Sequence, residues 1–183
     1  MRGLLRLRLW FRAKQRENRL NNLLILGAGG YGHVVREIAE DMGIFDKIDF
    51  LDDSSPLAIG KFDDAEKFLK DYPNAIVALG NADLRLKYIE KLRAAGFQLP
   101  TITSPKSHVS KSAKVAAGCV VEAMAVVNAN AGLSEGTFVC AGAIVNHNAS
   151  VGKGCTLQCG SVAPANSTLS DKTALRYNEV YGA

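Results

Sequence analysis

The 183-residue sequence predicts two folded parts in series, a small α/β domain over residues 23–104 and a three-sided parallel β-helix over residues 105–183. Three observations lead to this prediction. In the first part, apolar runs of strand length alternate with helical patterns. A glycine-rich turn follows the first of those runs. In the second part, an aliphatic residue recurs at every sixth position, which is typical of a solenoid.

Residues 1–22 form a basic N-terminal extension, with seven arginines and lysines against one glutamate. Its net charge of +6 exceeds the +4 of the whole chain, so residues 23–183 sum to −2, which argues against a nucleic-acid partner. Because leucine, tryptophan and phenylalanine are mixed with the arginines, peripheral contact with an anionic membrane is one interpretation. A frayed extension or an upstream start codon is the other. The arginines interrupt the apolar run, so no secretory signal is expected.

The composition is that of an ordinary globular protein, with 48% hydrophobic and 22% charged residues. The sequence has no run of about 18 apolar residues that would predict a membrane span. The four cysteines form no CxxC pair, which argues against a zinc ribbon and favours free thiols in a reducing compartment. We therefore expect a cytoplasmic chain without a metal site.

The α/β part opens with the predicted strand Leu23–Leu26, and residues 27–32 then read GAGGYG, which fits GxGxxG. A helix is expected from there to Gly43. Further strands are expected at residues 48–51, 75–79 and 99–103, with helices at 63–72 and 82–95. The last helix has an apolar face of Leu84, Tyr88, Ile89 and Leu92. This alternation is typical of a parallel, Rossmann-like sheet covered by helices.

The carboxyl ends of the predicted strands carry the candidate ligand residues, because ligands of parallel α/β sheets bind at that edge. Glycines there let backbone N–H groups approach a phosphate, and carboxylates bind a ribose or a base. These ends carry residues 29–32, Asp52, Asp53, Gly80 and Asn81. A nucleotide or nucleotide-sugar is the favoured ligand, since about 80 residues make only half of a dinucleotide fold. The alternatives are a dinucleotide ligand, glycines that serve packing alone, and aspartates that serve only a strand-end turn.

The second part repeats every six residues from Val109 onward, and eleven of the thirteen positions in that column are valine or leucine. Neither a helix face nor an ordinary strand has this period. Three residues further on, glycine or asparagine fills nine of twelve positions, and both tolerate the positive φ of a corner. Each hexapeptide therefore predicts one short strand and one turn, with three to a coil of 18 residues. The adjoining column is small and places Cys119 and Cys155 on one edge, two coils apart.

The order of the motifs is more specific than the repeat. GAGGYGHVV, FLDD, ALGN and TSPKSHVSKSAKV, followed by the hexapeptides, resemble the sialic acid O-acetyltransferase family and the related acetyltransferases of UDP-4-amino-sugars, over about residues 23–175. The resemblance implies a Rossmann-like, nucleotide-sugar-binding domain followed by a left-handed parallel β-helix of hexapeptide repeats. It further implies acetyl-CoA as co-substrate, a homotrimer, and a role in surface polysaccharide biosynthesis.

The resemblance places the catalytic histidine at His147, in AGAIVNHNASVG. A histidine there would take a proton from an amine or hydroxyl as it attacks the thioester; a solvated turn residue is the alternative interpretation. Asn148 stands where the family has an acidic residue that orients this base, and Thr156 where it often has a coenzyme-contacting histidine. Ala165, one coil beyond His147, offers a backbone N–H to the oxyanion. In the α/β part, the resemblance assigns six residues to the nucleotide-sugar: Gly29, Gly30, Tyr31, Asp52, Asp53 and Gly80.

Departures from the family pattern keep a second class of function open. Cys140 replaces a common asparagine, Tyr31 replaces a common histidine, and the repeat fades after Ala163, so a truncated or rebuilt last part of the β-helix is expected. The enzyme is the favoured interpretation, and a nucleotide-sugar-binding scaffold with a weakened site is the alternative. A serine- or galactoside-type acetyltransferase is a third interpretation, which the N-terminal motifs disfavour.

Overall fold

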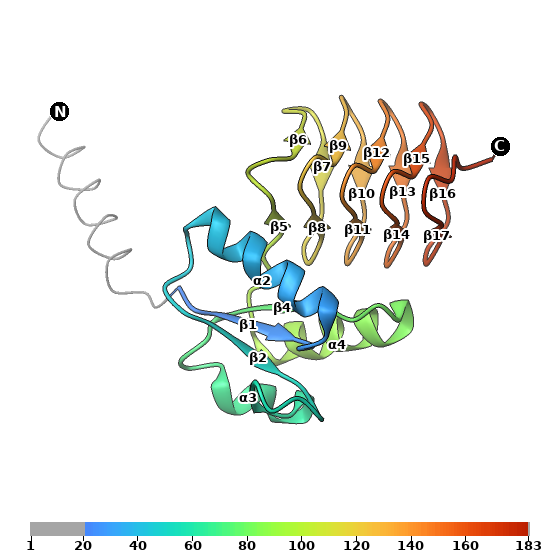
Figure 1. Cartoon of the computed structure of the whole chain (residues 1–183). Helices are drawn as coiled ribbons and strands as arrows, with labels where there is room; N and C mark the ends of the chain where they lie inside the picture. Colours follow the sequence, from blue (N-terminus) through green and yellow to red (C-terminus); the bar gives the residue numbers. More distant parts are fainter. Residues whose placement is uncertain (1–20, 183) are drawn as a thin grey trace, which may run out of the picture.

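The structure is a computed structural model that describes residues 21–182, so the predictions for the N-terminal extension lie outside the described residues, apart from its last two asparagines (Figure 1). An α/β domain lies along one side of a β-helix, whose coils stack in sequence order towards the C-terminus (Figure 1). No helix within these residues has the length and apolar stretch that crossing a bilayer requires.

The N-terminal domain contains a four-stranded parallel sheet in the order β3-β2-β1-β4. Its strands are β1 (Leu23–Leu26), β2 (Ile48–Leu51), β3 (Ala58–Gly60) and β4 (Asn74–Val77). Its helices are α2 (Gly30–Met42), the 3-10 helix η1 (Phe62–Asp64), α3 (Ala65–Phe68) and α4 (Ala82–Ala95). Every residue of β1 is buried, because its alternate side chains pack into hydrophobic clusters on opposite faces of the sheet.

Three sequence-based expectations for this domain were wrong in detail. The helix expected over residues 63–72 is divided into η1 and α3, and β3 was not anticipated. The strand expected over residues 99–103 is shortened to β5 (Ile102–Thr103), which pairs with the β-helix instead of the N-terminal sheet. Pro100 has no N–H to donate to a ladder, so the strand begins only beyond it. Leu84, assigned to the apolar face of α4, is 46% exposed.

The second domain is a left-handed parallel β-helix, in which each coil contributes one two-residue strand to each of three sheets. After β5, its strands within the described residues are β6 (His108–Val109), β7 (Lys114–Val115), β8 (Val120–Val121), β9 (Val126–Val127), β10 (Gly132–Leu133), β11 (Phe138–Val139), β12 (Ile144–Val145), β13 (Ser150–Val151), β14 (Thr156–Leu157), β15 (Val162–Ala163), β16 (Thr168–Leu169) and β17 (Ala174–Leu175). The sheets are β5-β8-β11-β14-β17, β6-β9-β12-β15 and β7-β10-β13-β16. Paired residues lie 18 apart, as Phe138 and Thr156 do, which confirms the predicted coil length.

The predicted columns occupy the predicted places. The aliphatic column from Val121 to Leu175 is buried in one continuous core, with each residue at most 3% exposed. Eleven of the twelve corner residues have φ between +57° and +72°, and Ser112 is the exception. Cys119 and Cys155 each donate from Sγ to a backbone carbonyl 15 residues further on, at 3.1 Å, so they are equivalent positions of different coils. All four cysteines are free thiols.

Candidate functional site

The glycine turn between β1 and α2 divides three tasks among its glycines. Gly27 has φ +111°, a backbone conformation that residues with a side chain rarely adopt. Gly32 allows a close approach, because a Cβ on it would lie 2.0 Å from the carbonyl oxygen of Gly27. A Cβ on Gly29 or Gly30 would meet nothing within 4 Å. The first turn of α2 has no side-chain cap, so its N–H groups face open space in which a phosphate can bind.

The two aspartates after β2 differ in their availability to a ligand. Asp52 accepts the N–H of Ala28 at 2.9 Å through Oδ2, and those of Ser54 and Ser55 at 3.0 Å through Oδ1. The bonds from Ala28 and Ser54 are the main reason that the pKa of Asp52 is lowered. Asp53 is exposed and accepts one backbone N–H at 3.1 Å. Asp52 therefore shapes the glycine turn, whereas Asp53 remains open.

Tyr31 is the second residue of α2 and directs its ring to the β-helix. The centroid of its ring lies 4.6 Å from that of Phe138, and its Oη is buried without a hydrogen-bond partner among the described residues. Burial and the neighbouring Cys140 and Glu122 raise the pKa of Tyr31. Tyr31 thus packs at the junction between the two domains.

Arg85 of α4 crosses this junction and is fully buried. Its guanidinium donates to backbone carbonyls on both sides, at Leu79 (2.6 Å) and Gly80 (3.2 Å) after β4 and at Gly136 (2.8 Å) and Gly154 (2.6 Å) on β-helix corners. Gly80, a predicted ligand residue, is exposed and has open space around it. The loop that carries Gly80 is therefore tied to the β-helix through one side chain.

Thr156, the predicted coenzyme contact, lies at the same junction as the first residue of β14. Its hydroxyl oxygen accepts a hydrogen bond from Nη2 of Arg85 at 3.1 Å. In this structure the side chain therefore serves the contact between the domains. Its role toward a coenzyme stays a prediction.

His147 stands on the corner after β12 and is exposed. Its ring Nδ1 lies 3.0 Å from Oδ1 of Asn146, which also accepts the backbone N–H of His147 at 2.9 Å. The side chain that the histidine ring contacts is therefore that of the preceding residue. Sequence reasoning missed Asn146, although asparagine recurs with the coil period at positions 128 and 146.

Asn148, expected to orient the ring of His147, instead joins a ladder of corner asparagines. Its Nδ2 donates to Oδ1 of Asn166 at 3.0 Å, and its Oδ1 accepts from Nδ2 of Asn130 at 3.4 Å. Its φ of +57° makes it the corner residue itself, stacked on the corners of adjacent coils. Its position beside His147 is as predicted by the motif, but its hydrogen bonds run along the β-helix.

Ala165 lies one coil beyond His147, and its N–H donates to no described residue. The N–H groups at the equivalent corner positions Ala141, His147 and Lys153 are bound by side-chain oxygens at 3.1, 2.9 and 2.7 Å. The N–H of Ala165 therefore has no acceptor among the described residues, and its role toward an oxyanion stays a prediction.

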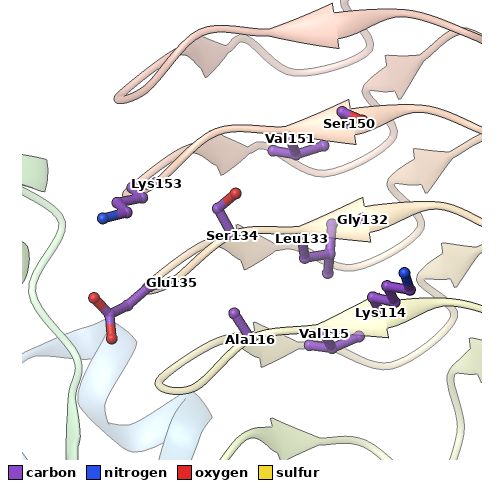
Figure 2. Close-up of a pocket in the computed structure, with 10 residues that line it drawn as sticks. All are labelled: Lys114, Val115, Ala116, Gly132, Leu133, Ser134, Glu135, Ser150, Val151 and Lys153. Atoms are coloured by element: carbon purple, nitrogen blue, oxygen red, sulfur yellow. The ribbon is translucent and has the colours of Figure 1, made fainter.

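A groove of about 610 Å³ lies on the outer face of the sheet that contains β7, β10 and β13 (Figure 2). Small residues such as Gly132, Ser134 and Ser150 line it, and Lys114 and Lys153 lie at opposite ends (Figure 2). Ser150 follows His147 by three residues. The strand that follows His147, β13, therefore lines part of the groove.

The candidate residues form two groups that a single chain keeps apart. Gly29, Gly30, Asp53 and Gly80 lie at the ligand edge of the N-terminal sheet. The β-helix sheet that packs on this domain is the one containing β8, β11 and β14, whereas His147 follows β12 of another sheet (Figure 1). His147 has no hydrogen bond to the N-terminal domain within residues 21–182.

The fold and these two groups define a protein in which an α/β domain with an open glycine turn is joined to a hexapeptide β-helix with an exposed histidine. Residues 22–92 match the family model described as the PglD N-terminal domain.

Several solved structures similar to this chain are acetyltransferases. The acetyltransferase domain of PglB from Neisseria gonorrhoeae FA1090, in complex with acetyl coenzyme A, is 24% identical, with a TM-score of 0.61 over 90% of this chain and 95% of that one. A second structure of that PglB domain is 27% identical, with a TM-score of 0.58 over 88% and 94%. PerB from Caulobacter crescentus, in complex with CoA and GDP-perosamine, is 21% identical, with a TM-score of 0.62 over 88% and 92%. The predicted resemblance to left-handed β-helix acetyltransferases with a Rossmann-like domain is confirmed.

Proposed function

We propose that the chain transfers the acetyl group of acetyl-CoA to an amino group of a nucleotide-linked sugar. The observation that carries the proposal is the pairing of an open glycine turn in a PglD-type domain with an exposed, oriented histidine on a β-helix corner. Acetyl coenzyme A in the PglB structure and GDP-perosamine in the PerB structure support these two substrate classes. A sugar hydroxyl, including one of sialic acid, is the alternative acceptor, and surface polysaccharide synthesis is the process proposed.

His147 acts as the general base in this proposal. The amine attacks the thioester carbonyl carbon, a C–N bond forms, and the amine proton passes to the imidazole. The N–H of Ala165 donates to the oxyanion of the tetrahedral intermediate. The C–S bond then breaks, and the imidazolium returns the proton to the departing thiolate of CoA. Asn148 sits beside the base as the corner residue.

The nucleotide part of the substrate would bind at the glycine turn. The N–H groups at Gly29 and Gly30 receive the phosphates, because both glycines leave room for close approach. Asp53 and Gly80 contact the ribose or base, while Asp52 holds the turn and Tyr31 supports it from the junction. Thr156 is proposed to contact the coenzyme by donating its hydroxyl hydrogen, because the bond from Arg85 uses only the oxygen as acceptor.

The two groups of residues would meet between copies of the chain. Since His147 lies away from its own N-terminal domain, a neighbouring copy supplies the complementary surface, and a homotrimer closes this arrangement. Sedimentation should then give three times the 19.6 kDa chain mass. A fully active monomer would contradict this part of the proposal.

The activity is tested by following CoA thiol release with UDP- and GDP-linked amino sugars. His147→Ala should lower kcat by about 10²–10⁴-fold, the usual contribution of a positioned base. His108→Ala is the matched control, because His108 is also exposed on the sheet that contains β12, and it should keep wild-type rates. Equal rates for wild type and His147→Ala would exclude the proposed base. If calorimetry detects binding of a nucleotide-sugar but no binding of acetyl-CoA, the alternative of a nucleotide-sugar-binding scaffold is favoured instead.

A further inference from the structure

The side-chain oxygen of Asn146 receives three hydrogen-bond donors. The backbone N–H of His147 lies 2.9 Å from Oδ1, ring Nδ1 of His147 lies 3.0 Å from it, and Nδ2 of Asn128 on the preceding coil lies 3.2 Å from it. A backbone N–H and an amide NH₂ can only donate, so the atom that faces them must be the oxygen. The orientation of the Asn146 amide is therefore fixed by two partners that are independent of the histidine ring.

This orientation determines the protonation of the ring. An amide oxygen accepts but does not donate, so the contact with Nδ1 is a hydrogen bond only when Nδ1 carries the hydrogen. In a neutral imidazole Nε2 then has the lone pair. We propose that Asn146 is a positioning residue that keeps His147 in the Nδ1–H tautomer, so that Nε2 accepts the substrate proton. This inference rests on the proposed function only for its catalytic consequence.

The backbone around the pair is fixed well enough to hold this geometry. The N–H of Asn146 donates to Ala163 on the next coil at 2.9 Å, and its carbonyl accepts from Ala149 at 3.2 Å. The carbonyl of His147 accepts from Asn166 at 3.1 Å. Pro164 lies 18 residues beyond Asn146, at the equivalent position of the next coil, and has no side-chain amide. The stack of Asn128 on Asn146 therefore ends on the coil that carries His147. The side-chain oxygen of Asn146 therefore contacts both the backbone N–H and the ring of His147.

The tautomer can be measured without any substrate. Long-range ¹H–¹⁵N NMR spectra of the full chain, at a pH at which the ring is neutral, distinguish Nδ1–H from Nε2–H, and His147→Gln assigns the signals among three histidines. We expect Nδ1–H in the wild type and in Asn146→Asp, which keeps an acceptor, and loss of that preference in Asn146→Ala. The Nε2–H form in the wild type, or an unchanged spectrum in Asn146→Ala, would overturn the proposal.

Kinetics then test the consequence. Asn146→Ala should lower kcat by about 10-fold or more with little change in KM, within the ~10²–10⁴-fold that a positioned base contributes, and Asn146→Asp should restore most of the rate. Asn178→Gly is the control, because it removes a corner asparagine with φ +58° elsewhere on the β-helix and should change neither readout. A wild type that shows the Nδ1–H tautomer but no transferase activity would refute the proposed function and leave the positioning intact. An Asn146→Ala enzyme with the wild-type kcat would refute the catalytic consequence.

Discussion

The carboxylate of Asp52 holds the glycine turn in place, and this role can be separated from ligand binding. Its two oxygens accept three backbone N–H groups and the hydroxyl of Ser54. An amide side chain has only one acceptor atom, so Asp52→Asn should lower the free energy of unfolding by about 1–3 kcal/mol at neutral pH. Urea denaturation measures this loss. Asp53→Asn, which affects a single backbone donor, should cost less.

The same residue gives a pH dependence with a defined sign. Because the folded-state pKa of Asp52 is lowered, its stabilisation is complete above the ordinary carboxyl pKa of about 3.9 and is lost as the pH falls through the folded value. The stability difference between wild type and Asp52→Asn should therefore shrink in acid. A difference that stays constant down to low pH would show that the carboxylate charge is not what holds the turn.

At the scale of the hexapeptide, the corner residue determines whether the chain can turn without strain. Gly142 has φ +69°, and a Cβ there would meet only the backbone nitrogen of Gly160, at 3.9 Å. Gly142→Ala therefore adds no clash, and its expected cost of about 1–2 kcal/mol is that of a side chain in the left-handed region. Gly132→Ala is the control, because Gly132 has open space and no positive φ, and it should change stability by no more than about 0.5 kcal/mol. If urea denaturation gives the same loss of unfolding free energy for Gly142→Ala and Gly132→Ala, strain at the corner is ruled out.

The β-helix was predictable because its coil repeats the same local environment every 18 residues. Val145 is buried like Val127, and Asn148 is a corner like Asn130, because each pair is 18 residues apart. A single residue that departs from its column therefore does not hide the repeat. Met124 shows the limit of the residue rule, since it adopts φ +62° with a long side chain. His147 directly precedes the corner residue Asn148, whose place in the repeat the sequence predicts, whereas the catalytic role of His147 stays a prediction.

The contacts that single residues make across coils and domains were not predictable in this way. Asn146 and Asn148 look alike in the sequence, and only the direction of their side chains shows that one meets the histidine ring and the other meets Asn166. The face of α4 was misjudged, because Leu84 was assigned to it and is exposed, whereas the neighbouring Arg85 is buried. The buried guanidinium of Arg85 is satisfied by carbonyls up to 70 residues away, and no periodic pattern in the sequence predicts such a contact.

For the whole molecule, Arg85 is a buried link between the N-terminal domain and the β-helix. Burial lowers the pKa of its guanidinium, and no carboxylate is among its hydrogen-bond acceptors in the described residues. Backbone carbonyls and the ring of Phe138, 4.0 Å from the guanidinium carbon, stabilise the charge instead. Because these carbonyls belong to both domains, we expect the side chain to fix the angle at which the Gly80 loop meets the β-helix.

Arg85→Met should therefore destabilise the protein by about 3 kcal/mol or more, because it leaves several buried carbonyls without a donor. Arg85→Lys should restore only part of the loss, since an ammonium group cannot span the fork of acceptors. Arg93→Met is the matched control on the same helix, because Arg93 also reaches a β-helix corner but through a half-exposed ion pair with Glu135, and such pairs contribute about 0–1 kcal/mol. If calorimetric unfolding shows the Arg85→Met loss, a separate transition for the N-terminal domain would identify the broken junction as its cause. If Arg85→Met and Arg93→Met instead prove equally mild, the two domains are joined by their apolar contacts, and Arg85 does not set their angle.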